Sequence, residues 1–100
     1  MAGDWKELYI SAQRGNFELV RYHVVTGVNI NYQHPEFMTT ALIACIEHQH
    51  YEIAEFLLQN GADPAQKEDW GTHTPLSMAK STKNQKLIKL VEAYLSQNVG

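Results

Sequence analysis

The sequence predicts an all-α protein in which three helix–turn–helix units follow one another along a single domain of 100 residues. Two observations support this prediction. Shifting the sequence against itself by 34 residues aligns Leu8 with Leu42 and Leu76, and Gly27 with Gly61. Such a fixed period is the sequence signature of repeat proteins. Within each unit, apolar residues also recur three and four positions apart, as they do on one face of a helix.

Each unit is expected to contain two helices. The expected helices span residues 4–13, 17–25, 40–48, 51–59, 74–80 and 85–95. Asp4 and Glu7 have the spacing of a capping box at the start of the first helix. Pro75 suits the first turn of a helix, and Gly27 and Gly61 suit the left-handed residue that ends one.

The units cover about residues 1–34, 35–68 and 69–100, and polar stretches at 31–39 and 65–73 read as loops between them. No single helix can bury its apolar face alone, so stacking of the units is expected to create one continuous core. Six residues of the second helices recur in register and are predicted to lie in that core: Leu19, Ile53, Leu87, Tyr22, Phe56 and Leu90.

Five stretches of the chain resemble the ankyrin repeat: Thr40–Leu42, 51–63, Thr74–Leu76, 14–20 and 27–31. The resemblance covers roughly the whole chain. It implies pairs of antiparallel helices joined by finger loops and stacked as a slightly curved solenoid. It also implies that protein partners dock on the concave side, against the fingers and the first helices.

The chain departs from the family pattern at several glycine positions. Gln49 and Lys83 stand where the family has a glycine between the two helices, so they must adopt a strained backbone or change the turn. Met38 and Thr72 replace the glycine near the finger tips. Each repeat is 34 residues long, about one more than the family has, which argues against regular hairpins in the fingers.

Charge and cysteine content narrow the function classes. The net charge of −3 and the absence of a basic excess argue against nucleic acid as a partner. No apolar run is long enough to span a membrane, and the N-terminus lacks the apolar region of a secretory signal. Cys45 is the single cysteine, which excludes an internal disulfide and suits a reducing compartment. A cytoplasmic location is therefore expected, with the nucleus left open.

The middle unit is acidic, whereas the last unit carries Lys80, Lys83, Lys86 and Lys89 at intervals of three. We interpret these lysines as a solvated outer face and a polar cap on the last unit. The alternative is a charge-patterned surface that steers a partner.

No residues with catalytic chemistry emerge from the sequence. Paired carboxylates, a phosphate-binding loop and a catalytic triad are not apparent, so we predict no enzyme and no cofactor. Cys45 aligns with Ser11 and Ala79, which indicates a small packed side chain. His48 and His50 form a His-x-His pair that could supply two metal ligands. Their spacing to other residues completes no ligand set, and the family favours histidine for packing at the place of His50, so no metal is predicted.

The aromatic residues of the loops are the main candidates for a binding site. Phe37 and Trp70 lie in successive polar loops, and Trp5 starts the first helix. Large aromatic side chains of this kind often anchor protein interfaces. The alternative is that they pack on neighbouring fingers, or that Trp5 caps the end of the stack. A polar surround is predicted to consist of Glu36, Thr39, Glu47, His48, Asp69, His73 and Ser81.

The predicted function is protein–protein recognition, as an adaptor or an inhibitor, by a chain that is monomeric when unbound. A self-associating structural unit is the main alternative, and a small enzyme or metal-binding protein is a weaker one.

Overall fold

The computed structural model describes residues 5–33, 35–69, 71 and 73–97, and this part of the chain forms six helices and no strand. The helices are α1 (Trp5–Arg14), α2 (Phe17–Val25), α3 (Ala41–Glu47), α4 (Tyr51–Gln59), α5 (Pro75–Thr82) and α6 (Gln85–Gln97). The predicted all-α class and the repeated helix pairs are confirmed.

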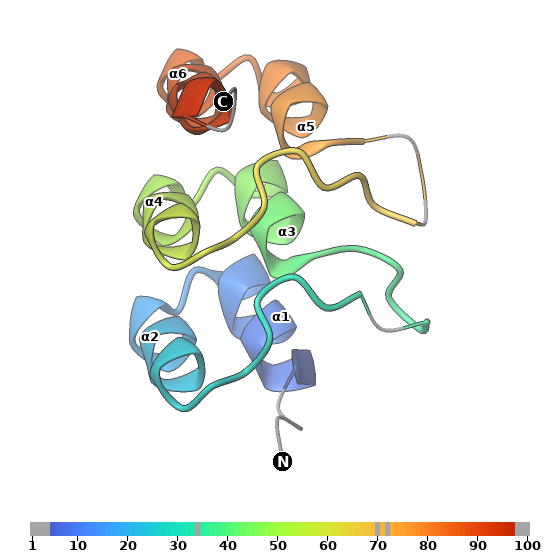
Figure 1. The fold of residues 1–100 in the computed structure, drawn as a ribbon, viewed down its shortest axis with the longest axis vertical. Coiled ribbons are helices and arrows are strands. Elements are labelled where there is room, and N and C mark those ends of the chain that lie inside the picture. The colour runs from blue at the N-terminus through green and yellow to red at the C-terminus, as the bar shows by residue number, and fades with distance from the viewer. Residues whose placement is uncertain (1–4, 34, 70, 72, 98–100) are drawn as a thin grey trace.

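The three helix pairs are stacked in the order of the sequence (Figure 1). Helices α1, α3 and α5 form one row, in which α3 contacts both neighbours, and α2, α4 and α6 form the second row. The two loops that join the pairs project beyond the first row as fingers. We call α1, α3 and α5 the inner helices and α2, α4 and α6 the outer helices.

Side-chain caps fix where the helices begin. The Thr40 hydroxyl accepts a hydrogen bond from the Ile43 amide at 3.1 Å. Thr74 and Ser77 form a reciprocal capping box at the start of α5, next to Pro75 in the first turn. These bonds satisfy amide groups that have no partner inside the helix.

The turn inside each helix pair uses the same left-handed residue. Gly15 has φ 81°, and Gln49 and Lys83 both have φ 61°. The two non-glycine residues therefore accept a strained backbone instead of changing the turn. Gly15 has a second reason to be glycine, because a Cβ atom there would lie 2.6 Å from the His50 ring. His50 Nε2 lies 3.0 Å from the Gln13 carbonyl oxygen, so this histidine packs two repeats together.

The finger loops depart from regular hairpins, as predicted. Met38 takes the left-handed conformation expected of the glycine it replaces, with φ 56°, and Thr72 lies outside the described residues. Amide side chains, instead of strands, join the two fingers. The Asp63 amide donates to Asn31 Oδ1 at 2.8 Å, and Gln66 Nε2 donates to the Asn31 carbonyl at 2.9 Å.

Gln33 extends this connection toward the finger tips. Its Nε2 donates to the Lys67 carbonyl at 3.0 Å, and its Oε1 accepts from the Asp69 amide at 2.8 Å. The pairing of the two fingers therefore depends on a few side chains and not on a continuous backbone ladder.

The core runs through the whole stack. Residues 41–46 of α3 are all buried, and Leu8, Leu57 and Leu87 continue the same cluster into the other repeats. Cys45 is fully buried, and burial raises the pKa of its thiol far above the ordinary value. This agrees with the predicted packed thiol.

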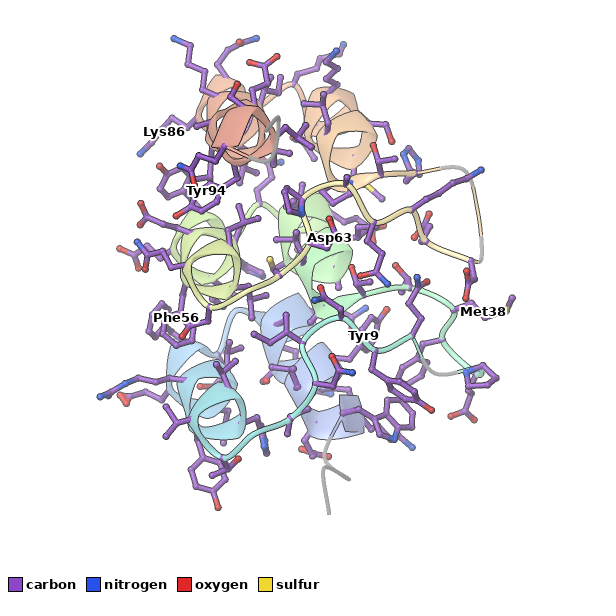
Figure 2. All side chains as sticks on the ribbon, in the orientation of Figure 1. Tyr9, Met38, Phe56, Asp63, Lys86 and Tyr94 are labelled. Carbon is purple, nitrogen blue, oxygen red and sulfur yellow. The ribbon has the colours of Figure 1, made fainter. Side chains whose placement is uncertain are left out.

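Two of the six predicted core residues on the outer helices are not in the core. Ile53, Leu87 and Leu90 are buried and Phe56 is partly buried, whereas Leu19 is 42% exposed and Tyr22 is 59% exposed. The prediction was wrong for Leu19 and Tyr22 because this face of an outer helix is covered by the preceding helix pair. Phe56 shows this, since its ring lies 5.2 Å from Phe17 in the pair before it (Figure 2).

A histidine occupies a core position in the first repeat. His23 is buried and aligns in the 34-residue register with Leu57 and Val91, which are also buried. Its Nδ1 atom is shielded from solvent and has no hydrogen-bond partner within the described part of the chain. A buried polar atom without a partner is destabilising.

We expect His23→Leu to increase the free energy of unfolding by about 1–2 kcal/mol, because it replaces an unsatisfied nitrogen with the side chain found at the aligned Leu57. Denaturant unfolding followed by circular dichroism measures the change. The reverse substitution Leu57→His should destabilise the chain. An unchanged or lower stability of His23→Leu would contradict this account.

Candidate functional site

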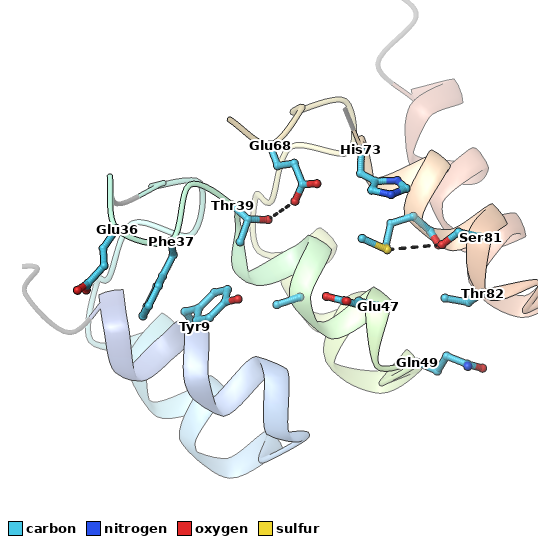
Figure 3. A pocket seen from close by; sticks show the side chains of 12 residues that line it. Tyr9, Glu36, Phe37, Thr39, Glu47, Gln49, Glu68, His73, Ser81 and Thr82 are labelled. Atoms are coloured by element: carbon cyan, nitrogen blue, oxygen red, sulfur yellow. Dashed lines mark hydrogen bonds between the residues drawn. The ribbon is translucent and has the colours of Figure 1, made fainter. Parts of the chain in front are cut away.

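A groove of about 870 Å³ lies beside the inner helices and beneath the fingers (Figure 3). Its lining comprises Tyr9, Glu36, Phe37, Thr39, Ala44, Glu47, Gln49, Glu68, His73, Met78, Ser81 and Thr82. All three repeats contribute to it, since Tyr9 belongs to α1, Glu47 to α3 and Ser81 to α5. The groove exists only when the three helix pairs are stacked.

The structure brings together in this groove six of the residues predicted to bind a partner: Glu36, Phe37, Thr39, Glu47, His73 and Ser81. Three others lie outside its lining. Trp5 is partly buried beside the groove, His48 is exposed just after α3, and Asp69 is exposed in the second finger. Trp70 falls outside the described residues.

The aromatic residues of α1 and the first finger form a cluster. The Phe37 ring stacks on Tyr9 at a centroid distance of 4.5 Å and meets Trp5 edge-on at 5.3 Å. Trp5 also meets Tyr32 edge-on at 6.0 Å. Phe37 therefore anchors the first finger onto α1, and not onto a neighbouring finger as the alternative had it. Phe37 also lines the groove, and its role in binding a partner stays a prediction.

The groove is acidic. Glu36, Glu47 and Glu68 line it, and none of its lining residues is a lysine or an arginine. Burial, and then the negative charges of Glu47 and Glu68, raise the pKa of the Tyr9 phenol above its ordinary value. The shift indicates that the floor of the groove has a negative potential.

Glu68 is the most enclosed of the three carboxylates. It is buried, and its Oε1 atom accepts a hydrogen bond from the Thr39 hydroxyl at 2.7 Å (Figure 3). A Cβ atom at Gly71 would lie 3.0 Å from the other carboxylate oxygen, so the glycine permits a close approach. The Glu68 amide also donates to the His73 carbonyl at 3.0 Å. These contacts fix the carboxylate between the two fingers.

Sequence reasoning missed several lining residues, notably Tyr9, Glu68 and Met78. Tyr9 belongs to the apolar period of α1, which predicts burial and gives no sign that one edge of the ring faces a groove. Met78 aligns with Ala44 at the 34-residue period. This alignment predicts that the two residues occupy equivalent positions on neighbouring inner helices. Glu68 lies in a loop, where no periodicity indicates its direction.

The described residues offer no assembled metal site. No group of three or more His, Cys, Asp and Glu side chains comes together among them. The rings of His48 and His50 are 6.3 Å apart, and the His50 ring already contacts the Gln13 carbonyl.

No helix in the described ranges is both long and apolar enough to cross a membrane.

Three stacked helix pairs with projecting loops define a helical repeat protein. The family described as "Ankyrin repeats (3 copies)" matches residues 8–99, and the chain belongs to the ankyrin-repeat family. Proteins of this family generally act through protein–protein interaction, and they are typically non-catalytic.

Two curated relatives show the same similarity. The chain is 33% identical over 82 residues to "Ankyrin repeat and KH domain-containing protein mask-1" of Caenorhabditis elegans. It is 29% identical over 87 residues to "Putative ankyrin repeat protein FPV014" of Fowlpox virus (strain NVSL). The matched regions are 82% and 87% of this chain but only 3% and 20% of the two relatives.

We expect Phe37→Ala to lower the free energy of unfolding by about 1–3 kcal/mol, because the partly buried ring packs on both Tyr9 and Trp5. Chemical denaturation measures the loss. The exposed Lys67 of the second finger provides a control, and Lys67→Ala should leave stability unchanged. If Phe37→Ala unfolds at the same denaturant concentration as the parent chain, the aromatic cluster is not stabilising.

We also expect Glu47→Gln to lower the pKa of Tyr9, because the substitution removes one of the two negative charges that raise it. Nuclear magnetic resonance of ring-labelled tyrosine reports this pKa directly. Glu52→Gln, on the exposed side of α4, should have no effect. If the pKa of Tyr9 does not change in Glu47→Gln, the charge of Glu47 does not act on the Tyr9 phenol.

The raised pKa also sets the sign of a pH effect. The contribution of the protonated Tyr9 to the free energy of unfolding is fully present below pH 10.0, the pKa of the unfolded chain. It is lost as the pH rises through the higher pKa of the folded chain.

Proposed function

We propose that this chain binds a segment of a partner protein in the groove beside the inner helices, and that the segment carries a lysine or arginine next to an apolar side chain. The observation behind the proposal is the composition of the groove. Three carboxylates, from Glu36, Glu47 and Glu68, line the groove together with apolar side chains, those of Phe37, Ala44 and Met78. Such a surface complements a short segment of mixed basic and apolar character.

The carboxylates can supply both attraction and orientation. Glu47 is exposed, so it can attract a basic partner over a distance at low ionic strength. Glu68 is enclosed, and Thr39 holds one of its oxygens in place. A guanidinium or ammonium group that reaches it would form a charge-assisted hydrogen bond, which is stronger than a neutral one.

The role proposed for the protein is that of an adaptor or an inhibitor, acting as a monomer until it meets its partner. The proposal assigns it to a reducing intracellular compartment, which suits a buried free thiol at Cys45.

Site-directed photo-cross-linking tests the proposal. A benzophenone amino acid placed at Ser81, an exposed residue of the groove, should cross-link to the partner in cells that contain it. The same label at Lys89, exposed on α6, should not. Charge reversal by Glu47→Lys should abolish the Ser81 cross-link, whereas Glu52→Lys on the exposed face of α4 should preserve it. Equal cross-linking from Ser81 and Lys89, or none from Ser81, would contradict binding in the groove.

A further inference from the structure

The first repeat carries exposed apolar surface that the other repeats lack. The exposed large hydrophobic residues of the described chain are Leu19, Tyr22, Val25 and Tyr32, and all belong to this repeat. The first three are spaced by three residues along α2, so they lie on one side of that helix. Isolated apolar side chains on a surface are common, whereas the largest contiguous apolar patch of a protein is often functional.

The internal repeat shows what this surface is shaped to receive. Leu19 aligns with Ile53 and Leu87, which are 3% and 0% exposed, and an outer helix of the preceding repeat packs beside each. Tyr22 aligns with Phe56, which contacts Phe17 of α2 at 5.2 Å and lies between α4 and α2 in Figure 2. The outward side of α2 is therefore a helix-receiving face on which no helix of the described residues packs.

The opposite end of the stack does not complement this face. Phe17 and Tyr51, which cover the following repeat, correspond to Gln85 in α6. Likewise Leu58, which is buried beside Tyr94, corresponds to the exposed Glu92. A second copy stacked head-to-tail would set polar side chains on Leu19 and Tyr22, so this occupant is disfavoured.

The inner half of the same end is polar as well. Glu7 is exposed on α1 at the position where Ala41 and Pro75 are buried against the preceding inner helix. A complete further helix pair stacked here would bury the Glu7 carboxylate, which is costly without a partner. Among the described residues, the exposed apolar side chains on the helices of this end belong to α2, which forms its outer half. The shape and extent of this apolar surface therefore suit one helix and not two.

We propose that the face formed by Leu19 and Tyr22, with the exposed Val25 beside it, binds a single amphipathic α-helix of a partner protein, which lies along α2 as α2 lies along α4. A stable dimer buries about 800 Å² on each side, and three partly exposed side chains provide roughly a third to half of that. The small area favours one short helix over a second copy docked by two-fold symmetry. This face is separate from the acidic groove, and the proposal does not depend on the one made for the groove.

The helix α4 provides a probe, because its Tyr51 and Leu58 already cover α6 in this fold. Tyr51 contacts Lys86 of α6 at 4.7 Å, and Leu58 lies beside Tyr94. The probe is a helix-stabilised synthetic peptide with the sequence of residues 49–61, added to the full chain. Methyl nuclear magnetic resonance signals of Leu19 and Val25 report binding at the proposed face.

Saturable shifts of the Leu19 and Val25 methyl groups are expected. Tyr22→Glu should weaken binding by about tenfold or more while leaving the circular dichroism spectrum unchanged, since Tyr22 is exposed. The control variants Lys89→Glu on α6 and Glu47→Lys in the groove should bind the peptide as the parent chain does. No saturable shift would overturn the proposal, as would shifts confined to the groove. A dimer would replace the proposal if the Leu19 and Val25 methyl signals shift with the concentration of the chain in the absence of peptide, and if these shifts disappear in Tyr22→Glu.

Discussion

The burial of α3 from both sides is the interaction on which the rest of the structure depends. Residues 41–46 of this seven-residue helix are all buried, with α1 on one side and α5 on the other. A helix this short is not stable in isolation, so its order comes from packing. Every other feature of the molecule follows from keeping the three helix pairs in register around it. The groove has residues from all three repeats. It loses part of its lining if the first or the third helix pair separates from α3.

The left-handed turns show how strictly that register is maintained. The chain tolerates φ 61° at Gln49 and at Lys83 instead of changing the geometry that Gly15 sets in the first repeat. The fingers are less strictly determined. A few side-chain hydrogen bonds connect them in place of a backbone ladder, and these come from Asn31, Gln33 and Gln66. The groove thus has a rigid helical floor and a wall of loops held by few bonds, an arrangement that allows the wall to adjust to a bound segment.

The sequence predicted the elements well and the surroundings of particular residues poorly. Helical periodicity placed all six helices, because that signal is local, while the predicted capping box at Asp4 lies outside the described residues. The same register that placed Ile53 correctly failed for Leu19, since a repeat position specifies which way a side chain points and not whether anything covers it. Phe37 and Glu68 were harder still. Their directions depend on how each finger folds over α1 and α3, which is a long-range effect that no period reports.

The two proposed binding surfaces use the first repeat in different ways. The inner helix α1 gives the groove Tyr9, which supports Phe37, while the outer helix α2 presents Leu19 and Tyr22 at the end of the stack. The first repeat also contains His23, whose buried Nδ1 has no hydrogen-bond partner within the described part of the chain. A ligand that binds only the folded repeat stabilises it by mass action. A helix bound on α2 would therefore stabilise the folded first repeat, whose Tyr9 also lines the groove.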